Sequence, residues 1–369
     1  MEGMFQHCES LTSLNIKFFC TQNVQITSYM FDSCINLENL QFLTKIEDNF
    51  YYSDDEDNNI DTTVTTNCEY VSTRKIKNIK YMFNNCLSLK NLDLSNINTY
   101  NVMDASRMFG HCENLTVLNL DSFQTPNLLN SSGMFESCVN LTSIKLGNNF
   151  TGNNIEDMSY MFSDCPKLDF LNLSKFELYH ISNMSGLFSL CTNLGSIQFF
   201  NKIYSGDIIE MNSMFYNCSN IEEINFKKYT DINVGDMERI FSGCINLTNL
   251  DISTFRTSNS KNMNEAFYNC YSLNSLSLSN FDTNNVKNME KMFTNCSSLE
   301  ILNLSNFETN KVENMEYMFS NCSNLTTLII NSEIESLINM DNMFSNCSSL
   351  IELNLNKFKK NSNNEFYVL

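Results

Sequence analysis

Cysteine is the residue type whose number and spacing in this chain could carry the most chemistry. The chain has 15 cysteines in 369 residues, and thirteen of them follow a phenylalanine by three positions. The thirteen pairs are Phe5/Cys8, Phe31/Cys34, Phe83/Cys86, Phe109/Cys112, Phe135/Cys138, Phe162/Cys165, Phe188/Cys191, Phe215/Cys218, Phe241/Cys244, Phe267/Cys270, Phe293/Cys296, Phe319/Cys322 and Phe344/Cys347. Zinc sites use paired ligands such as Cys-x-x-Cys, and the sequence has none. The spacing therefore indicates copies of one structural position.

Equivalent cysteines in successive copies would stack as a column, which allows three interpretations. Neighbouring Cα atoms about 4.8 Å apart lie within disulfide range, but parallel Cβ vectors would not close to the preferred ~3.8 Å without strain. Thiols that point inward behave as small hydrophobic groups. We expect a structural column in the core, with disulfide rungs and a metal site as alternatives. A packed column of free thiols fits a reducing compartment better.

The other residues that could carry catalysis are scattered. The histidines His7, His111 and His180 lie several copies apart, so a joint site is not expected. The sequence has no nucleophile elbow, phosphate-binding loop, dinucleotide fingerprint or His-Glu-x-x-His motif. We therefore expect no enzymatic activity, no catalytic residue, no metal and no cofactor.

In an acidic stretch at residues 55–61, Asp or Asn stands at every second position, as the first ligands of a calcium-binding loop do. It lacks the glycine at the sixth position, and Thr66 stands where the bidentate glutamate is required. Charged segments with few apolar residues rarely order themselves, so we expect a surface loop here. A calcium site and a degenerate coil around Cys68 are the alternatives.

A repeat positions the cysteines. From Phe83 onward the phenylalanines of the pairs are 25 to 27 residues apart, and the units contain Leu-x-x-Leu-x-Leu or a close variant of it. A near-constant period of this size lies within the range of roughly 20–29 residues that is typical of leucine-rich repeats. We therefore predict a solenoid, in which each coil packs only against its neighbours.

Each unit is predicted to contain one helix and one strand. In the unit 288–312 the first apolar residues recur at i, i+3, i+4 and i+7, which is one face of a short helix. Asn288 is suited to cap the free amides of that helix. Leu302 and Leu304 then alternate with Asn303 as in a strand. The predicted fold class is an α/β repeat solenoid, leucine-rich-repeat-like, with one short parallel strand and one short helix per ~26-residue coil.

The array divides into four predicted segments. Residues 1–46 form solenoid coils 1–2, and residues 47–75 form an acidic insertion loop or a degenerate coil. Residues 76–356 continue the same array, and residues 357–369 form a short C-terminal tail. Solenoids normally shield their terminal coils, yet these ends look uncapped. Another segment, another chain or self-association through the uncapped ends would cover the apolar residues Met4, Phe5, Leu11, Leu14 and Ile16.

The repeat unit resembles that of the BspA-like leucine-rich repeat surface proteins. Units such as residues 292–315 carry the resemblance, which extends over nearly all of the chain outside residues 47–75 and the C-terminal tail. It implies a cell-surface or secreted protein that binds host or neighbouring proteins without enzymatic activity. No secretion signal, lipobox or membrane anchor is seen in the sequence, so a cytoplasmic location is the alternative.

The balance of charge narrows the class of partner. The chain has 23 basic and 42 acidic residues, which gives a formal net charge of −19. Nucleic acids require a basic stripe, and anionic membranes also disfavour an acidic surface. No stretch approaches the ~18 consecutive apolar residues of a membrane span. We expect a protein partner, no nucleic acid and no membrane span.

The strands provide the predicted contact surface. The residue between the two inward leucines of each strand points outward, and amides dominate this row. Stacked amides could simply hydrogen-bond to each other as a ladder. Exposed aromatic and charged groups in the middle of the chain are more typical of a contact site. The predicted binding residues are Phe170, Asn172, Gln198, Phe200, Glu223, Asn225 and Lys227. The sequence therefore predicts a non-enzymatic protein-binding module for adhesion or host interaction at a cell surface, or alternatively an intracellular scaffold.

Overall fold

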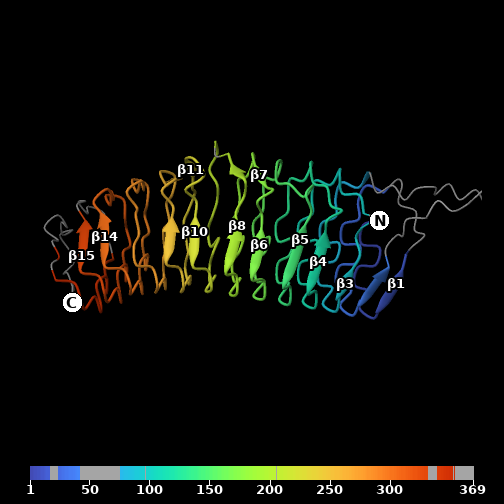
Figure 1. The fold of residues 1–369 in the computed structure, drawn as a ribbon, viewed down its shortest axis with the longest axis horizontal. Helices are drawn as coiled ribbons and strands as arrows, with labels where there is room; N and C mark the ends of the chain where they lie inside the picture. Colours follow the sequence, from blue (N-terminus) through green and yellow to red (C-terminus); the bar gives the residue numbers. More distant parts are fainter. Residues whose placement is uncertain are drawn as a thin grey trace, which may run out of the picture.

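The structure, a computed structural model, describes residues 1–16, 24–41, 75–95, 97–204, 206–330, 339–351 and 353. These residues form an elongated, gently curved stack of coils that runs from the N-terminal to the C-terminal end of the chain (Figure 1). The predicted repeat solenoid is confirmed. Most of the predicted insertion, with its calcium-loop alternative, and the whole predicted tail lie outside the described residues.

Parallel strands line one side of the stack. They are β1 (Ser13–Asn15), β2 (Asn39–Gln41), β3 (Asn91–Leu92), β4 (Val117–Leu120), β5 (Ser143–Leu146), β6 (Phe170–Asn172), β8 (Ser196–Gln198), β10 (Glu223–Asn225), β12 (Asn249–Asp251), β14 (Ile301–Leu304) and β15 (Thr327–Ile330). Their pairing is in register from coil to coil, so that Leu302 lies opposite Leu328. The hydrogen-bonded orders are β1-β2-β3, β4-β5, β6-β8, β10-β12 and β14-β15.

The coils on either side of residues 42–74 are direct neighbours. Strand β2 pairs with β3, which places Leu40 opposite Leu92. The phenylalanine rings of the same two coils, Phe31 and Phe83, are stacked with centroids 5.5 Å apart. The array is therefore continuous in space across this stretch of sequence.

Four shorter strands lie on a second side of the middle coils. They are β7 (Glu177–Leu178), β9 (Lys202–Ile203), β11 (Ile232–Asn233) and β13 (Phe255–Arg256), which pair as β7-β9 and β11-β13. In Figure 1, β7 and β11 lie on the opposite edge of the stack from β6, β8 and β10. The predicted pattern of one strand per coil missed them.

The predicted helix in each coil is wrong, because the described residues contain no α-helix. The segment with helical spacing is a run of turns, here called the turn segment. Alternate amides in it donate to the next coil, as from Tyr81 N to Ser106 O (2.9 Å) and from Phe83 N to Met108 O (2.8 Å). The intervening amides close turns, as from Asn84 N to Tyr81 O (3.2 Å). A helix would instead direct each amide to the carbonyl four residues earlier.

Two left-handed residues shape each turn segment. In one coil these are Tyr81 and Asn85, each with φ of 56°. This conformation costs roughly 1–2 kcal/mol for a residue other than glycine. Both residues donate their amides to the next coil, Asn85 to Gly110 O at 2.8 Å, and these bonds help to offset the cost. The apolar residues keep helical spacing although the backbone turns differently, which is why periodicity alone suggested a helix.

The core consists of columns of like side chains. The phenylalanine of each Phe-x-x-Cys pair stacks on its equivalent in the next coil, with ring centroids 5.3 to 6.2 Å apart. Full burial of one such ring contributes about 1.5–3 kcal/mol. A typical hydrogen bond contributes a net 0.5–1.5 kcal/mol or so. One buried ring therefore contributes more than one typical hydrogen bond. Ile16, expected to face solvent, instead belongs to this core and is 7 % exposed.

Buried threonines join some coils on the second side. Thr283 Oγ1 donates to Glu308 O (2.9 Å) and accepts from Glu308 N (2.8 Å). Thr257 bonds in the same way to the backbone of Asp282, and both threonines are at most 1 % exposed. Where Leu178 occupies this position, the backbones pair directly as β7 and β9. A threonine hydroxyl thus replaces strand pairing between these coils.

Candidate protein-binding surfaces

The cysteine column is part of the core, as predicted. Eleven of the thirteen described cysteines are buried, Cys8 is exposed, Cys347 is half-buried, and all thirteen are free thiols. The alternative of disulfide rungs is therefore wrong for these residues. From Cys34 onward each described thiol donates to the phenylalanine carbonyl oxygen of the preceding coil, as from Cys138 Sγ to Phe109 O (3.2 Å).

Burial keeps these thiols protonated. Loss of solvation raises the pKa of Cys138 and of Cys191 to about 12. Only the protonated thiol can donate the hydrogen bond to the preceding coil, and the thiolate is the form that attacks electrophiles or binds metals. The buried thiols therefore act as structural donors. Among the described residues, no group of three or more His, Cys, Asp or Glu side chains is placed to hold a metal ion.

Six of the seven predicted contact residues are exposed. Five of them lie on the strand face, defined as the outward side of the parallel strands, and they are Phe170, Asn172, Gln198, Glu223 and Asn225. The sixth, Lys227, lies in the turn after β10. The pairing of β6 with β8 places Asn172 opposite Gln198, with Phe170 at the start of β6. Strand β10, which carries Glu223 and Asn225, pairs with β12 in the described sheets.

The expected exposure of Phe200 is wrong, because its side chain is 0 % exposed. In the preceding coil, two residues separate the inward Leu173 from the core residue Phe176. In this coil, Phe200 follows directly after Phe199, so its ring enters the core with a centroid 6.3 Å from that of Phe176. The shortened turn after Gln198 therefore removes Phe200 from the strand face.

The outward asparagines do not form the amide ladder considered for this row. Asn172 Oδ1 accepts from the backbone N of Ser174 (3.0 Å), and Asn225 Oδ1 accepts from the backbone N of Lys227 (2.9 Å). These are turns in which a side-chain oxygen binds the amide two residues later. The asparagine side chains thus end the strand locally, and their NH₂ groups remain on the exposed face.

A second surface on the turn segments was missed by the sequence analysis. The first left-handed residue of each turn segment forms a row, here called the turn row. It consists of Gly3, Tyr29, Tyr81, Arg107, Gly133, Tyr160, Gly186, Ser213, Arg239, Glu265, Lys291, Tyr317 and Asn342. The antigen-binding loops of antibodies are enriched in several of these residue types, namely Tyr, Ser, Gly, Asn and Arg. The internal repeat contained a signal for this surface, since the residue varies between two nearly constant apolar positions.

Aromatic and basic side chains lie along the turn row over glycines. The rings of Tyr29 and Tyr81 are stacked with centroids 4.9 Å apart, and the guanidinium of Arg107 lies 6.0 Å from the Tyr81 centroid. A Cβ on Gly186 would lie 2.3 Å from Tyr160 Cε1, so the tyrosine ring packs directly over that glycine. Tyr160 is itself 44 % exposed. The row therefore presents aromatic area that is already ordered.

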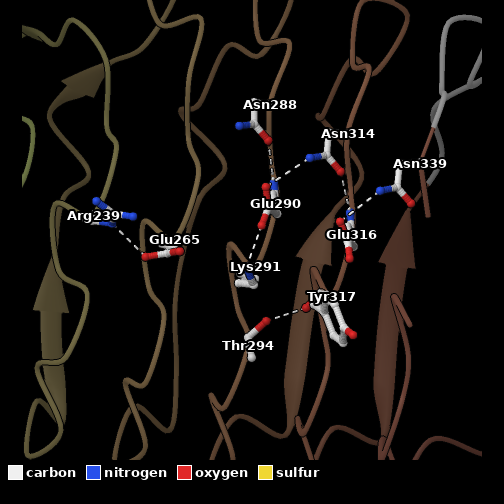
Figure 2. Close-up of polar contacts among 10 residues, drawn as sticks. All are labelled: Arg239, Glu265, Asn288, Glu290, Lys291, Thr294, Asn314, Glu316, Tyr317 and Asn339. Atoms are coloured by element: carbon white, nitrogen blue, oxygen red, sulfur yellow. Dashed lines mark hydrogen bonds and ion pairs between the residues drawn. The ribbon is translucent and has the colours of Figure 1, made fainter. Parts of the chain in front are cut away.

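Asparagine and glutamate side chains cross-link the turn segments near the C-terminal end (Figure 2). Asn314 Nδ2 donates to Glu290 Oε2 of the preceding coil (3.1 Å), while Asn314 Oδ1 accepts from Glu316 N (3.0 Å). Asn339 repeats the pattern with Glu316 Oε2 (2.9 Å), and Asn288 Oδ1 accepts from Glu290 N (3.0 Å). The expectation that these asparagines cap helices is wrong, because they close turns. The carboxylates of Glu290 and Glu316 are engaged in structural contacts.

Cations on the turn row are paired with carboxylates. Arg239 Nε lies 2.8 Å from Glu265 Oε2, and Lys291 Nζ lies 2.6 Å from Glu290 Oε1 (Figure 2). The hydrogen bond to Glu265 raises the pKa of Arg239 above its usual value. These pairs hold long side chains in fixed positions on a surface that is partly exposed.

Comparison with known proteins identifies the family. The profile of the family described as "Mycoplasma protein of unknown function, DUF285" matches residues 1–63, 44–165, 209–303 and 297–367. The chain belongs to this family. A profile described as "BspA type Leucine rich repeat region (6 copies)" matches residues 119–235. The predicted BspA-like leucine-rich repeat identity of this DUF285 protein is therefore confirmed.

A solved structure shows the same fold as this chain. A leucine-rich repeat protein from Bacteroides ovatus has 18% sequence identity and a TM-score of 0.53 over 95% of this chain and 80% of its own. A leucine rich cell surface protein from Faecalibacterium prausnitzii has 16% identity and a TM-score of 0.42 over 87% of this chain and 83% of its own. No curated protein sequence matches this DUF285 chain. A helix that could cross a bilayer is not found in the part of the chain that the structure describes.

Proposed function

We propose that the chain is a non-enzymatic module that binds a protein partner through its strand face. The observation that carries this proposal is Phe170, a large aromatic side chain that is 44 % exposed at the start of β6. Asn172 and Gln198 flank it with polar groups on paired strands. Exposed aromatic residues in such settings are enriched among the residues that dominate binding energy. The charge of −19 supports a protein partner over nucleic acid.

The module is proposed to act at a cell surface, in adhesion or host interaction. The support for this location is the BspA-like repeat, whose family resemblance implies surface exposure. The alternative is an intracellular scaffold that uses the same face, and the column of free thiols favours it. Protease treatment of intact cells that produce the chain distinguishes the two locations, because only a surface protein is cleaved before lysis.

The turn row is the second candidate for the binding surface. Its support is the ordered stack of Tyr29 and Tyr81, together with the exposed ring of Tyr160. Tyrosine supplies a large contact area at low cost in conformational entropy, because it has only two side-chain torsions. The two surfaces are therefore tested in the same experiment.

The test compares matched variants of the whole chain after a partner has been captured by cross-linking. Phe170→Ser should weaken binding by about thirtyfold, since dominant contact residues contribute ≥ 2 kcal/mol or so. Val117→Ser and Ile301→Ser are the controls, because these residues are 57 % and 59 % exposed at the first position of β4 and β14. Loss of binding in Tyr160→Ser alone would assign the partner to the turn row. Unchanged binding in both Phe170→Ser and Tyr160→Ser would refute both surfaces.

A further inference from the structure

Three carboxylates lie on or beside the strand face within two coils of the exposed ring of Phe170. Asp169 directly precedes β6, and Glu222 and Glu223 are the equivalents of Asp169 and Phe170 two coils further along. All three carboxylate side chains are exposed, and none forms an ion pair with another described residue. This surface therefore carries negative charge that the described part of the chain does not balance.

The lysines that precede this surface extend away from it. Lys145 pairs with Asp121 of the preceding coil. Lys167 Nζ donates to Asn140 Oδ1, which also belongs to the preceding coil (2.6 Å). Both side chains thus reach towards the N-terminal end of the stack and leave the carboxylates of the later coils uncovered.

Lys227, in the turn after β10, is close to a different carboxylate. Hydrogen bonds from Ser253, with a smaller contribution from the charge of Lys227, hold the pKa of Asp251 below its usual value. Asp251 lies in β12, one coil beyond Glu223. The positive charge of Lys227 is therefore shared with the following coil.

The coil between Asp169 and Glu222 has no side chain at the equivalent position. That position is Gly195, whose backbone N donates to Asp169 O (3.0 Å). A Cβ on Gly195 would lie 3.7 Å from its nearest neighbour, Asn220 Nδ2, so the space above the glycine is open. A side chain of a partner can therefore enter between the two carboxylates.

We propose that the surface formed by Asp169, Phe170, Glu222 and Glu223 binds an extended basic segment of the protein partner, with lysine or arginine at every third residue. This inference rests on the proposed function, because it uses the same exposed ring of the strand face. Asp169 and Glu222 lie two coils apart, which is about 9.6 Å at ~4.8 Å per strand. A polyproline II segment has three residues per turn and rises ~3.1 Å per residue, so cations three residues apart lie on one side of it, about 9.3 Å from each other. One cation would pair with each carboxylate, and the face of Phe170 attracts the same groups.

Two synthetic peptides of equal composition test the proposal by fluorescence anisotropy with the full chain. One repeats Arg-Pro-Pro, and the other groups its arginines at one end. The Arg-Pro-Pro peptide should bind more tightly, and its affinity should fall as salt is raised, because exposed charge pairs are screened. Asp169→Asn and Glu222→Gln should each weaken its binding about two- to fivefold. Glu300→Gln is the matched control and should change binding little, because Glu300 precedes Ile301 instead of an aromatic ring. Equal affinity for the two peptides overturns the proposal.

Gly195→Lys supplies the proposed cation from within the chain. Its ammonium group would lie between Asp169 and Glu222, so binding of the Arg-Pro-Pro peptide should fall at least tenfold. Gly195→Gln adds an uncharged side chain to the same open position and should retain most of the binding. Urea unfolding should show that both variants are folded. An equal loss in the two variants, or unchanged binding in Gly195→Lys, overturns the proposal.

The partner captured by cross-linking separates this proposal from the proposed function. The expected result is that binding is lost in Phe170→Ser and in Gly195→Lys and is retained in Gly195→Gln. Binding that is lost in Phe170→Ser and retained in Gly195→Lys would keep the strand face as the binding surface and refute the basic segment. Binding that is retained in both Phe170→Ser and Gly195→Lys would refute the strand face, and this proposal with it.

Discussion

Replacement of Thr283 by valine tests whether threonine hydroxyls join the coils. The two side chains have nearly the same shape, so the change removes the hydroxyl and leaves the packing. Thr283 is 1 % exposed, and its hydroxyl makes two hydrogen bonds to the backbone of Glu308, at 2.9 and 2.8 Å. A net contribution of about 1 kcal/mol per bond predicts a loss of roughly 2 kcal/mol, and up to ~3 kcal/mol if water does not reach the freed groups.

The loss should appear in two measurements. Urea unfolding followed by circular dichroism should give a lower free energy of unfolding for Thr283→Val. Thr283→Ser keeps the hydroxyl and loses one buried methyl group, so its loss should be about 1 kcal/mol. Hydrogen exchange should show faster exchange of the Glu308 amide in Thr283→Val alone.

Two outcomes would refute this reasoning about Thr283. One is a Thr283→Val variant as stable as the wild type. The other is a Glu308 amide that keeps its protection from exchange. Either result would mean that the coils are held at this point by apolar stacking alone. Thr257→Val repeats the test one coil earlier, since Thr257 makes the same pair of bonds to Asp282.

Three further predictions follow from the burial of the thiols and from the glycines of the turn row. In the native chain, alkylation at pH 8 should modify Cys8 quickly and Cys138 only after unfolding, as read by peptide mass spectrometry. Burial raises the pKa of Cys138 from 9.0 to about 12, so above pH 9 the unfolded chain loses a proton that the folded chain keeps. The free energy of unfolding should therefore fall as pH rises, by up to ~1.4 kcal/mol per pH unit for each such thiol, and Cys138→Ala should reduce that slope in urea titrations. Gly186→Ala should destabilise by about 1–2 kcal/mol in urea unfolding, because Gly186 has φ of 61° and its added Cβ would clash with Tyr160. Gly195→Ala, where the nearest atom is 3.7 Å away and φ is not positive, should change stability little; an equal loss in both variants would contradict the role of the turn row glycine.

The sequence predicted which residues are equivalent in successive coils. It did not predict the backbone conformation within a coil. The spacing of Phe83 and Cys86 correctly placed both residues in the core, because any regular coil superimposes equivalent residues on one column. Helical spacing did not distinguish a helix from a turn segment with left-handed residues at Tyr81 and Asn85. What separates them is the destination of the amides, which bond to the next coil, and single-unit periodicity contains no information about the neighbouring coil.

The candidate site was predicted in part. The alternation of side chains between the two faces of a strand correctly predicted that Phe170 and Asn172 are exposed. The same rule wrongly predicted that Phe200 is exposed, because the turn before Phe200 is shorter than the equivalent turn in the preceding coil. The turn row was missed because a helix was expected there, and Tyr160 would not have been placed over Gly186 on a helix.

The bonding of each turn segment to the next coil has a consequence for how such a gene can change in length. Excision of residues 263–288 would join Asn262 to Met289, two points that are equivalent in successive coils. The donors of the turn segment that contains Met237 and Phe241 would then meet the acceptors of a new neighbour in the same register. An excision of three or four residues within a turn segment would instead displace the thiol and the ring of that coil from their columns. Recombination that adds or removes whole units is therefore the change that this architecture tolerates best.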